Sequence, residues 1–154
     1  MTDYDLLIKQ AEEFADGNVW DITLYANISA LLYETLENIN WAGFYLMRGD
    51  ELLLGPFQGK TACMRIPVGR GVCGTAVKEQ RVVRVEDVHE FPGHIACDSA
   101  SESEIVLPIR SGKNKEHPGE IIGVLDIDST VKGRFSEEDE KGLKALVEVM
   151  EKYL

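Results

Sequence analysis

The sequence lacks any apolar run close to the ~18–20 residues that a membrane-spanning helix needs. Its first residues, MTDYDLLIKQAEEF, lack a basic segment followed by an apolar core, so we expect no signal peptide. Basic residues are also scarce: 16 Lys and Arg stand against 27 Asp and Glu, a formal net charge of −11. So acidic a chain repels phosphate backbones and anionic lipid, which argues against nucleic-acid and membrane partners. We expect a cytoplasmic protein, with a cationic or zwitterionic small ligand left open.

Cysteine is also sparse, with Cys63, Cys73 and Cys97 in 154 residues. A cytosolic chain of this length can build a core without staples, so these thiols are not a disulfide scaffold. Three interpretations of these cysteines remain open: inert buried thiols, metal ligands or redox-active thiols. A zinc set would combine them with His94, but the chain has no CxxC or HxxxH pair at the usual short spacing. We therefore predict no metal site.

The chain shows no internal repeat, low-complexity tract or Pro/Ser-rich linker, so we expect one domain over residues 1–154. Apolar residues recur at helical spacing near both ends, and Ser136 and Asp139 stand at capping-box spacing before the last helix. Between them, strands are predicted over residues 40–48, 51–57, 64–66, 81–87, 103–111 and 120–129. This order predicts an α+β fold, with a central, mainly antiparallel six-stranded sheet and the N- and C-terminal helices packed on one face.

The segment from Asp87 to Glu104 is long for a loop in a compact domain, which is typical of lids and binding loops. It carries His89, His94, Cys97 and Asp98 as well. A thiol near imidazoles can become an activated nucleophile, because a neighbouring cation lowers its pKa. The same residues suit a solvated loop surface, and spacing alone favours that simpler interpretation.

A glycine motif, GxGxxG, runs through Gly69, Gly71 and Gly74. A dinucleotide site needs a hydrophobic strand before this motif and a βαβ unit around it. Here the preceding CMRIPV is short and contains Pro67, so we interpret the motif as a tight turn into a helix.

Two acids, Asp126 and Asp128, stand two apart in the predicted strand VLDIDS, so both side chains project from one face of the sheet. Leu125 and Ile127 face the other way. Paired carboxylates on one face are costly unless they meet a cation or a proton. A binding site and an exposed strand end suit this pattern equally.

Four strings taken together resemble the free methionine-(R)-sulfoxide reductases, which are built on a GAF domain: NWAGFY, GRGVCGTA, DVHEFPGHIACDSASESEIVLP and IIGVLDIDS. The resemblance covers essentially the whole chain and includes all three cysteines, spaced 10 and 24 residues apart. It implies a single GAF domain and the thiol-dependent reduction of free L-methionine (R)-sulfoxide to methionine.

The resemblance also implies roles for particular residues. Cys97 becomes the nucleophile and passes through a sulfenic acid, Cys63 resolves it as an intramolecular disulfide, and Cys73 lies near the site. Thioredoxin is the implied reductant, the implied assembly is a homodimer, and no cofactor is needed. The implied substrate-binding residues are Trp41, Tyr45, Glu104, Asp126 and Asp128.

The chemistry of these residue types fits such a substrate. The carboxylates can hold the ammonium group of a free amino acid and supply a proton to the sulfoxide oxygen. Aromatic faces contact sulfur and methyl groups favourably. Two alternatives remain, a ligand-sensing GAF module and a peroxide-responsive redox sensor. We see no output domain, which speaks against the sensing module.

Overall fold

The computed structural model describes residues 1–95, 97, 99–112 and 115–154. Over these residues the chain forms four α-helices, one short 3-10 helix and six strands, so the α+β prediction is confirmed. In chain order the elements are α1 (Tyr4–Asp16), α2 (Asp21–Thr35), β1 (Trp41–Arg48), β2 (Glu51–Gly59), β3 (Arg65–Pro67), α3 (Gly71–Glu79), β4 (Val83–Val85), η1 (Val88–Glu90), β5 (Ser103–Arg110), β6 (Ile121–Ser129) and α4 (Glu137–Glu151).

The strands form one sheet in the order β3-β2-β1-β6-β5-β4, and every neighbouring pair is antiparallel. The predicted antiparallel sheet is thus confirmed. Strand β6, the last in the chain, lies between β1 and β5 and therefore at the centre. Its residues pair with Trp41–Leu46 of β1 along one edge and with Ser103–Arg110 of β5 along the other.

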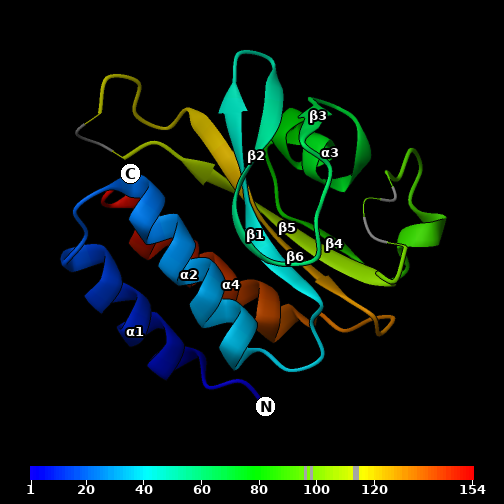
Figure 1. Ribbon diagram of the computed structural model, residues 1–154, viewed down its shortest axis with the longest axis horizontal. Coiled ribbons are helices and arrows are strands. Elements are labelled where there is room, and N and C mark those ends of the chain that lie inside the picture. The colour runs from blue at the N-terminus through cyan, green and yellow to red at the C-terminus, as the bar shows by residue number, and fades with distance from the viewer. Residues whose placement is uncertain (96, 98, 113–114) are drawn as a thin grey trace.

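Helices α1, α2 and α4 pack together on one face of the sheet, as predicted for the terminal helices, and α3 lies on the other side (Figure 1). Each terminal helix begins at a side-chain cap. Asp3 accepts a hydrogen bond from the Leu6 N–H, and the capping box of Ser136 and Asp139 is present. Among the described residues, no helix combines the length and apolarity needed to cross a membrane.

Alternation along the central strands separates the two faces of the sheet. Leu125 and Ile127 of β6 are fully buried in the core beneath α1, α2 and α4. Asp126 and Asp128 share the opposite face, as the sequence pattern predicted, and this is the face that carries α3. The same register brings Glu104 of β5 opposite Asp128.

Helix α3 begins at the predicted glycine turn. Gly69 and Gly71 adopt φ of +88° and +63°, which side chains other than glycine rarely tolerate. A Cβ on Gly74 would lie 2.5 Å from the carbonyl oxygen of Pro67, so only glycine lets the helix lie this close to the preceding strand. The interpretation as a tight turn into a helix is confirmed, and the turn sets α3 beside the acids of β6.

Candidate active site

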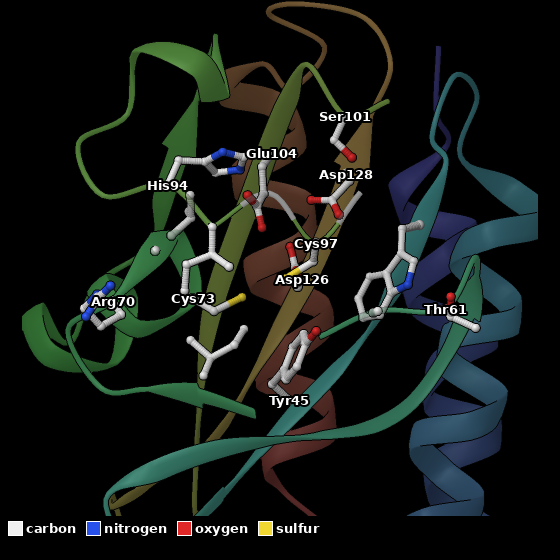
Figure 2. Close-up of a pocket in the computed structure, with 16 residues that line it drawn as sticks. Tyr45, Thr61, Arg70, Cys73, His94, Cys97, Ser101, Glu104, Asp126 and Asp128 are labelled. Carbon is white, nitrogen blue, oxygen red and sulfur yellow. The ribbon is translucent and has the colours of Figure 1, made fainter. Parts of the chain in front are cut away.

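A cavity with about 530 Å³ of space free of protein atoms, counted out to its mouth, opens on the α3 face of the sheet. Its floor comes from β1, β5 and β6, and its walls from α3, the β2–β3 loop and the loop before β5 (Figure 2). Seven of the eight residues that the resemblance assigned line it, all except Cys63: Trp41, Tyr45, Cys73, Cys97, Glu104, Asp126 and Asp128.

Cys63 and Cys97 are joined by a disulfide, with their Cα atoms 5.3 Å apart. It ties the β2–β3 loop to the loop that follows η1, and the Cys97 end lies within the cavity. The pairing implied by the resemblance is thus present. The bond occupies two residues of the alternative zinc set, so that interpretation is wrong for this structure.

Three acids meet in the interior of this cavity. Glu104 and Asp126 are only 8% and 5% exposed, and Asp128 is half-buried. Burial, followed by the charges of the neighbouring acids, raises the pKa of Glu104 well above its usual 4.5. Burial also raises the pKa of Asp126, but hydrogen bonds from Glu104 and Cys73 oppose that rise. Glu104 therefore holds its proton more tightly, and Asp126 ionises first.

The third thiol, Cys73 of α3, is buried beside these acids. The Sγ of Cys73 and one carboxylate oxygen each of Glu104 and Asp126 lie within 4.8 Å of one another. Burial, and then the charge of Asp126, raises the pKa of Cys73 well above its usual 9.0, so the thiol stays protonated and donates to the carboxylate of Asp126. A thiolate, not a thiol, is the nucleophile and metal ligand, so this trio suits proton sharing better than metal binding.

The aromatic residues Trp41 and Tyr45 stand on β1, both 2% exposed. Their rings are stacked with centroids 5.9 Å apart, and Trp41 stacks on Phe57 at 5.1 Å. Their polar atoms both donate to the β2–β3 loop. Trp41 Nε1–H reaches the carbonyl of Lys60 at 3.1 Å, and the Tyr45 hydroxyl reaches the carbonyl of Cys63 at 2.9 Å.

The histidines of the long loop separate into two environments. His94 lines the cavity, and burial followed by the charge of His89 lowers its pKa, so it is neutral near pH 7. A neutral imidazole gives no cationic stabilisation to a thiolate. His89 is exposed and pairs with Glu102 at 3.2 Å, which fits the solvated-loop interpretation. Asp98 lies outside the described residues.

Sequence reasoning missed several lining residues, among them Arg70, Thr61 and Ser101. Arg70 is the residue before α3 and lies inside the glycine motif, so that turn was the available signal for it. Ser101 accepts a hydrogen bond from Asn40 Nδ2 at 3.1 Å. No sequence pattern pointed to Thr61 or Ser101, because only the folded loops bring them to the cavity.

The chain resembles known proteins over most of its length. Residues 26–152 match the model of the GAF domain family. The "Free methionine-R-sulfoxide reductase" of Escherichia coli is 68% identical over 138 residues, which cover 90% of this chain and 80% of that protein.

Two solved structures extend this similarity. The "structure of fRMsr of Staphylococcus aureus (reduced form)" superposes with a TM-score of 0.93 at 51% identity, covering 100% of this chain and 96% of that one. The free methionine-R-sulfoxide reductase from Neisseria meningitidis "in complex with its substrate" gives a TM-score of 0.90 at 43% identity, covering 97% and 87%. The chain therefore belongs to the GAF domain family and, within it, to the free methionine-R-sulfoxide reductases.

Proposed function

We propose that this protein reduces free L-methionine (R)-sulfoxide to L-methionine, with Cys97 as nucleophile and Cys63 as resolving thiol. The observation that carries the proposal is the disulfide between these two residues at a buried cavity lined by three acids. Relatives that bear the name of this activity are similar over nearly the whole chain. The disulfide is then the state of the enzyme after one turnover.

The first step transfers the sulfoxide oxygen to Cys97. The Cys97 thiolate attacks the sulfur of the substrate and forms an Sγ–S bond, while the sulfoxide oxygen takes up a proton. The oxygen then passes to Sγ, so that an Sγ–O bond forms as the S–O and Sγ–S bonds break, and free methionine leaves. The oxygen and one proton remain on Cys97 as a sulfenic acid. Glu104 is our proton donor, because burial and the neighbouring acids raise its pKa, so that it keeps a proton beside the cavity more readily than an ordinary carboxyl does.

The second step closes the disulfide. The Cys63 thiolate attacks the sulfenic sulfur of Cys97, the S–S bond forms, and the hydroxyl leaves as water after taking a proton. An external dithiol then reduces the disulfide by thiol exchange and is itself oxidised. We propose thioredoxin as that dithiol and the reducing cytoplasm as the setting, in line with the sequence-based expectations. The homodimer that the resemblance implies also stays a prediction.

The remaining lining residues suit recognition of a free amino acid. Asp126 is 5% exposed, and its Oδ1 has no hydrogen-bond partner among the residues that the structure describes. A buried carboxylate of this kind calls for a donor from the ligand, which the ammonium of the substrate supplies. The stacked rings of Trp41 and Tyr45 suit the methyl-sulfur end.

The test is NADPH oxidation coupled through thioredoxin and its reductase, run separately with the R and S epimers of free methionine sulfoxide. We expect turnover with the R epimer alone. A thiol count on the reduced protein separates the alternatives, since an enzyme loses two thiols for each methionine released. Binding without methionine release would favour a sensing module. Thiol loss with peroxide but not with sulfoxide would favour a redox sensor.

A further inference from the structure

The β2–β3 loop, residues 60–64, carries Cys63 and is tied to Cys97 by the disulfide and to the strands beneath it by hydrogen bonds. Ala62 packs against the apolar cluster on the α3 face, whereas Met64 is 79% exposed. Its start is fixed by the bond from Trp41 Nε1 to Lys60, and its end by the Leu54 N–H on the carbonyl of Met64 at 2.9 Å. Between these points, the Tyr45 hydroxyl binds the carbonyl of Cys63 itself. This hydrogen bond therefore acts directly on the residue that carries the resolving thiol.

Tyr45 is well built for such a role. It stands in the middle of β1, a central strand, and is paired with Leu54 on one side and Val124 on the other. Its ring is 2% exposed and stacked against Trp41, so the hydroxyl has a fixed position and points into the cavity (Figure 2). Burial, and then the charge of Asp126, raises the pKa of Tyr45 above its usual 10.0. The hydroxyl thus keeps its proton and stays a donor.

We propose that Tyr45 is a positioning residue for the resolving step: its hydroxyl holds the main chain of Cys63 so that the thiol meets the Cys97 sulfenic acid. The proposal rests on the function proposed above, in which Cys63 resolves Cys97. A disulfide tolerates only a narrow range of Cα separations, about 4.4–6.8 Å, and the closed pair here has 5.3 Å, so the main chain of Cys63 has to be held near this position for the bond to form. Methionine leaves before this step, so the hydroxyl matters after chemistry on the substrate is complete.

The experiment is Tyr45→Phe, which keeps the ring and its stacking but removes the donor. The reduced variant is mixed rapidly with free methionine (R)-sulfoxide, and methionine release and disulfide formation are timed separately. We expect the rate of disulfide formation to fall at least about tenfold more than the rate of methionine release, since misplacement by ~1 Å is costly to a reaction. A 1,3-dicarbonyl probe should trap more Cys97 sulfenic acid than in the wild type. Equal slowing of both steps, or of neither, would overturn the proposal.

A second arm separates this proposal from the proposed function. A Cys thiolate attacks hydrogen peroxide, the O–O bond breaks, and the products are a sulfenic acid and hydroxide, which takes a proton from solvent to become water. Peroxide therefore starts the resolving step without the sulfoxide. Tyr45→Phe should slow disulfide closure on this route too. Suppose the wild type closes its disulfide after peroxide but releases no methionine from the sulfoxide. The proposed activity then fails, while the peroxide route still measures whether Tyr45 positions Cys63 for disulfide closure.

Two matched variants complete the design. Tyr25→Phe alters another buried tyrosine, 4% exposed in the core on the opposite face, and should leave both rates unchanged. Trp41→Phe removes the other bond to the loop, which acts on Lys60, three residues before Cys63. It should shift the ratio of the two rates in the same direction as Tyr45→Phe but by less. A shift in the opposite direction would contradict positioning by the β1 aromatics.

Discussion

The face of the sheet beneath α1, α2 and α4 carries a core of aliphatic and aromatic side chains, whereas the face beneath α3 carries three acids, a thiol and one end of a disulfide. Both faces are built from the same strands. On β6, Leu125 and Ile127 are completely buried in the core, while Asp126 and Asp128 line the cavity. Neighbouring residues of one strand thus serve stability and chemistry separately.

This division has an energetic reason. Burying acids such as Glu104 and Asp126 disfavours their charged forms and weakens the fold, as their raised pKa values show. Burying an aliphatic side chain such as Ile127 stabilises the fold by about 1.5–3 kcal/mol. Buried apolar side chains therefore offset the cost of burying these acids, and substitutions of the two kinds of residue should have different effects.

Among substitutions on the two faces, we expect Cys97→Ser on the cavity face to have the largest effect on activity. Methionine formation should fall by more than about 10³-fold, including the first stoichiometric turnover, because the attacking atom is lost. Methionine released per chain after one turnover is the measurement. Release near the wild-type amount would remove Cys97 from the role of nucleophile.

Replacing the other half of the disulfide should divide the reaction into its two steps. Cys63→Ser should still release about one methionine per chain, because the nucleophile is intact, and then stop at the sulfenic acid. Steady-state turnover with thioredoxin should be lost. Full turnover in this variant would shift the resolving role to Cys73, the thiol buried beside the acids.

A change in the substrate tests whether the acids recognise the ammonium group. Acetylation of the nitrogen of methionine sulfoxide removes its charge and leaves a buried carboxylate without its partner, at a cost of about 3–5 kcal/mol. We expect kcat/KM to fall by about 100-fold or more, since each 1.4 kcal/mol is a factor of about ten. Comparable values for the free and acetylated substrates would show that the cavity does not bind the ammonium.

The pH dependence of stability should differ between the faces. Native Glu104 keeps its proton to a higher pH than the unfolded chain does, so the native state binds more protons and the free energy of unfolding falls as pH rises above about 4.5. For each pH unit by which the native pKa exceeds the unfolded one, the free energy of unfolding at high pH is lower by about 1.4 kcal/mol. Glu104→Gln should therefore be more stable than the wild type at pH 8, and the difference should shrink towards pH 4. Urea unfolding of the reduced proteins measures it, and an advantage that grows on acidification would contradict the raised pKa.

The core-face counterpart is Ile127→Val, for which we expect the smallest effect. It removes one buried methylene and should lower the free energy of unfolding by about 0.5–1.5 kcal/mol. Because no titratable group is altered, the loss should be the same at pH 4 and pH 8, and kcat/KM should stay close to that of the wild type. A strong effect on kcat/KM would show that the two faces are coupled.

Much of the fold followed from local patterns. The alternation of β6 predicted that its two acids share one face and its aliphatic residues the other, and the capping box of Ser136 and Asp139 predicted the start of α4. The order of the strands in the sheet could not be predicted from local patterns. Strand β6 lies between β1 and β5 through pairings that connect distant parts of the chain. The loop to Glu104 was expected to carry function from its length, and His94 and Cys97 do line the cavity. Spacing alone favoured a solvated surface for its histidines, which holds for His89, paired with Glu102, but not for His94.

The sequence by itself determined the α+β class, the apolar and acidic faces of β6 and the identity of the three thiols, since these depend on residue type and short-range periodicity. Only the tertiary structure decided what these residues do to one another. Glu104 and Asp126 are 22 positions apart, and they influence each other's pKa because neighbouring strands bring them together in a buried site. The hydroxyl of Tyr45 lies 18 positions from Cys63, and its bond exists because β1 passes beneath the β2–β3 loop. Hydrogen bonds and desolvation depend on distance in space, which the order of residues does not specify.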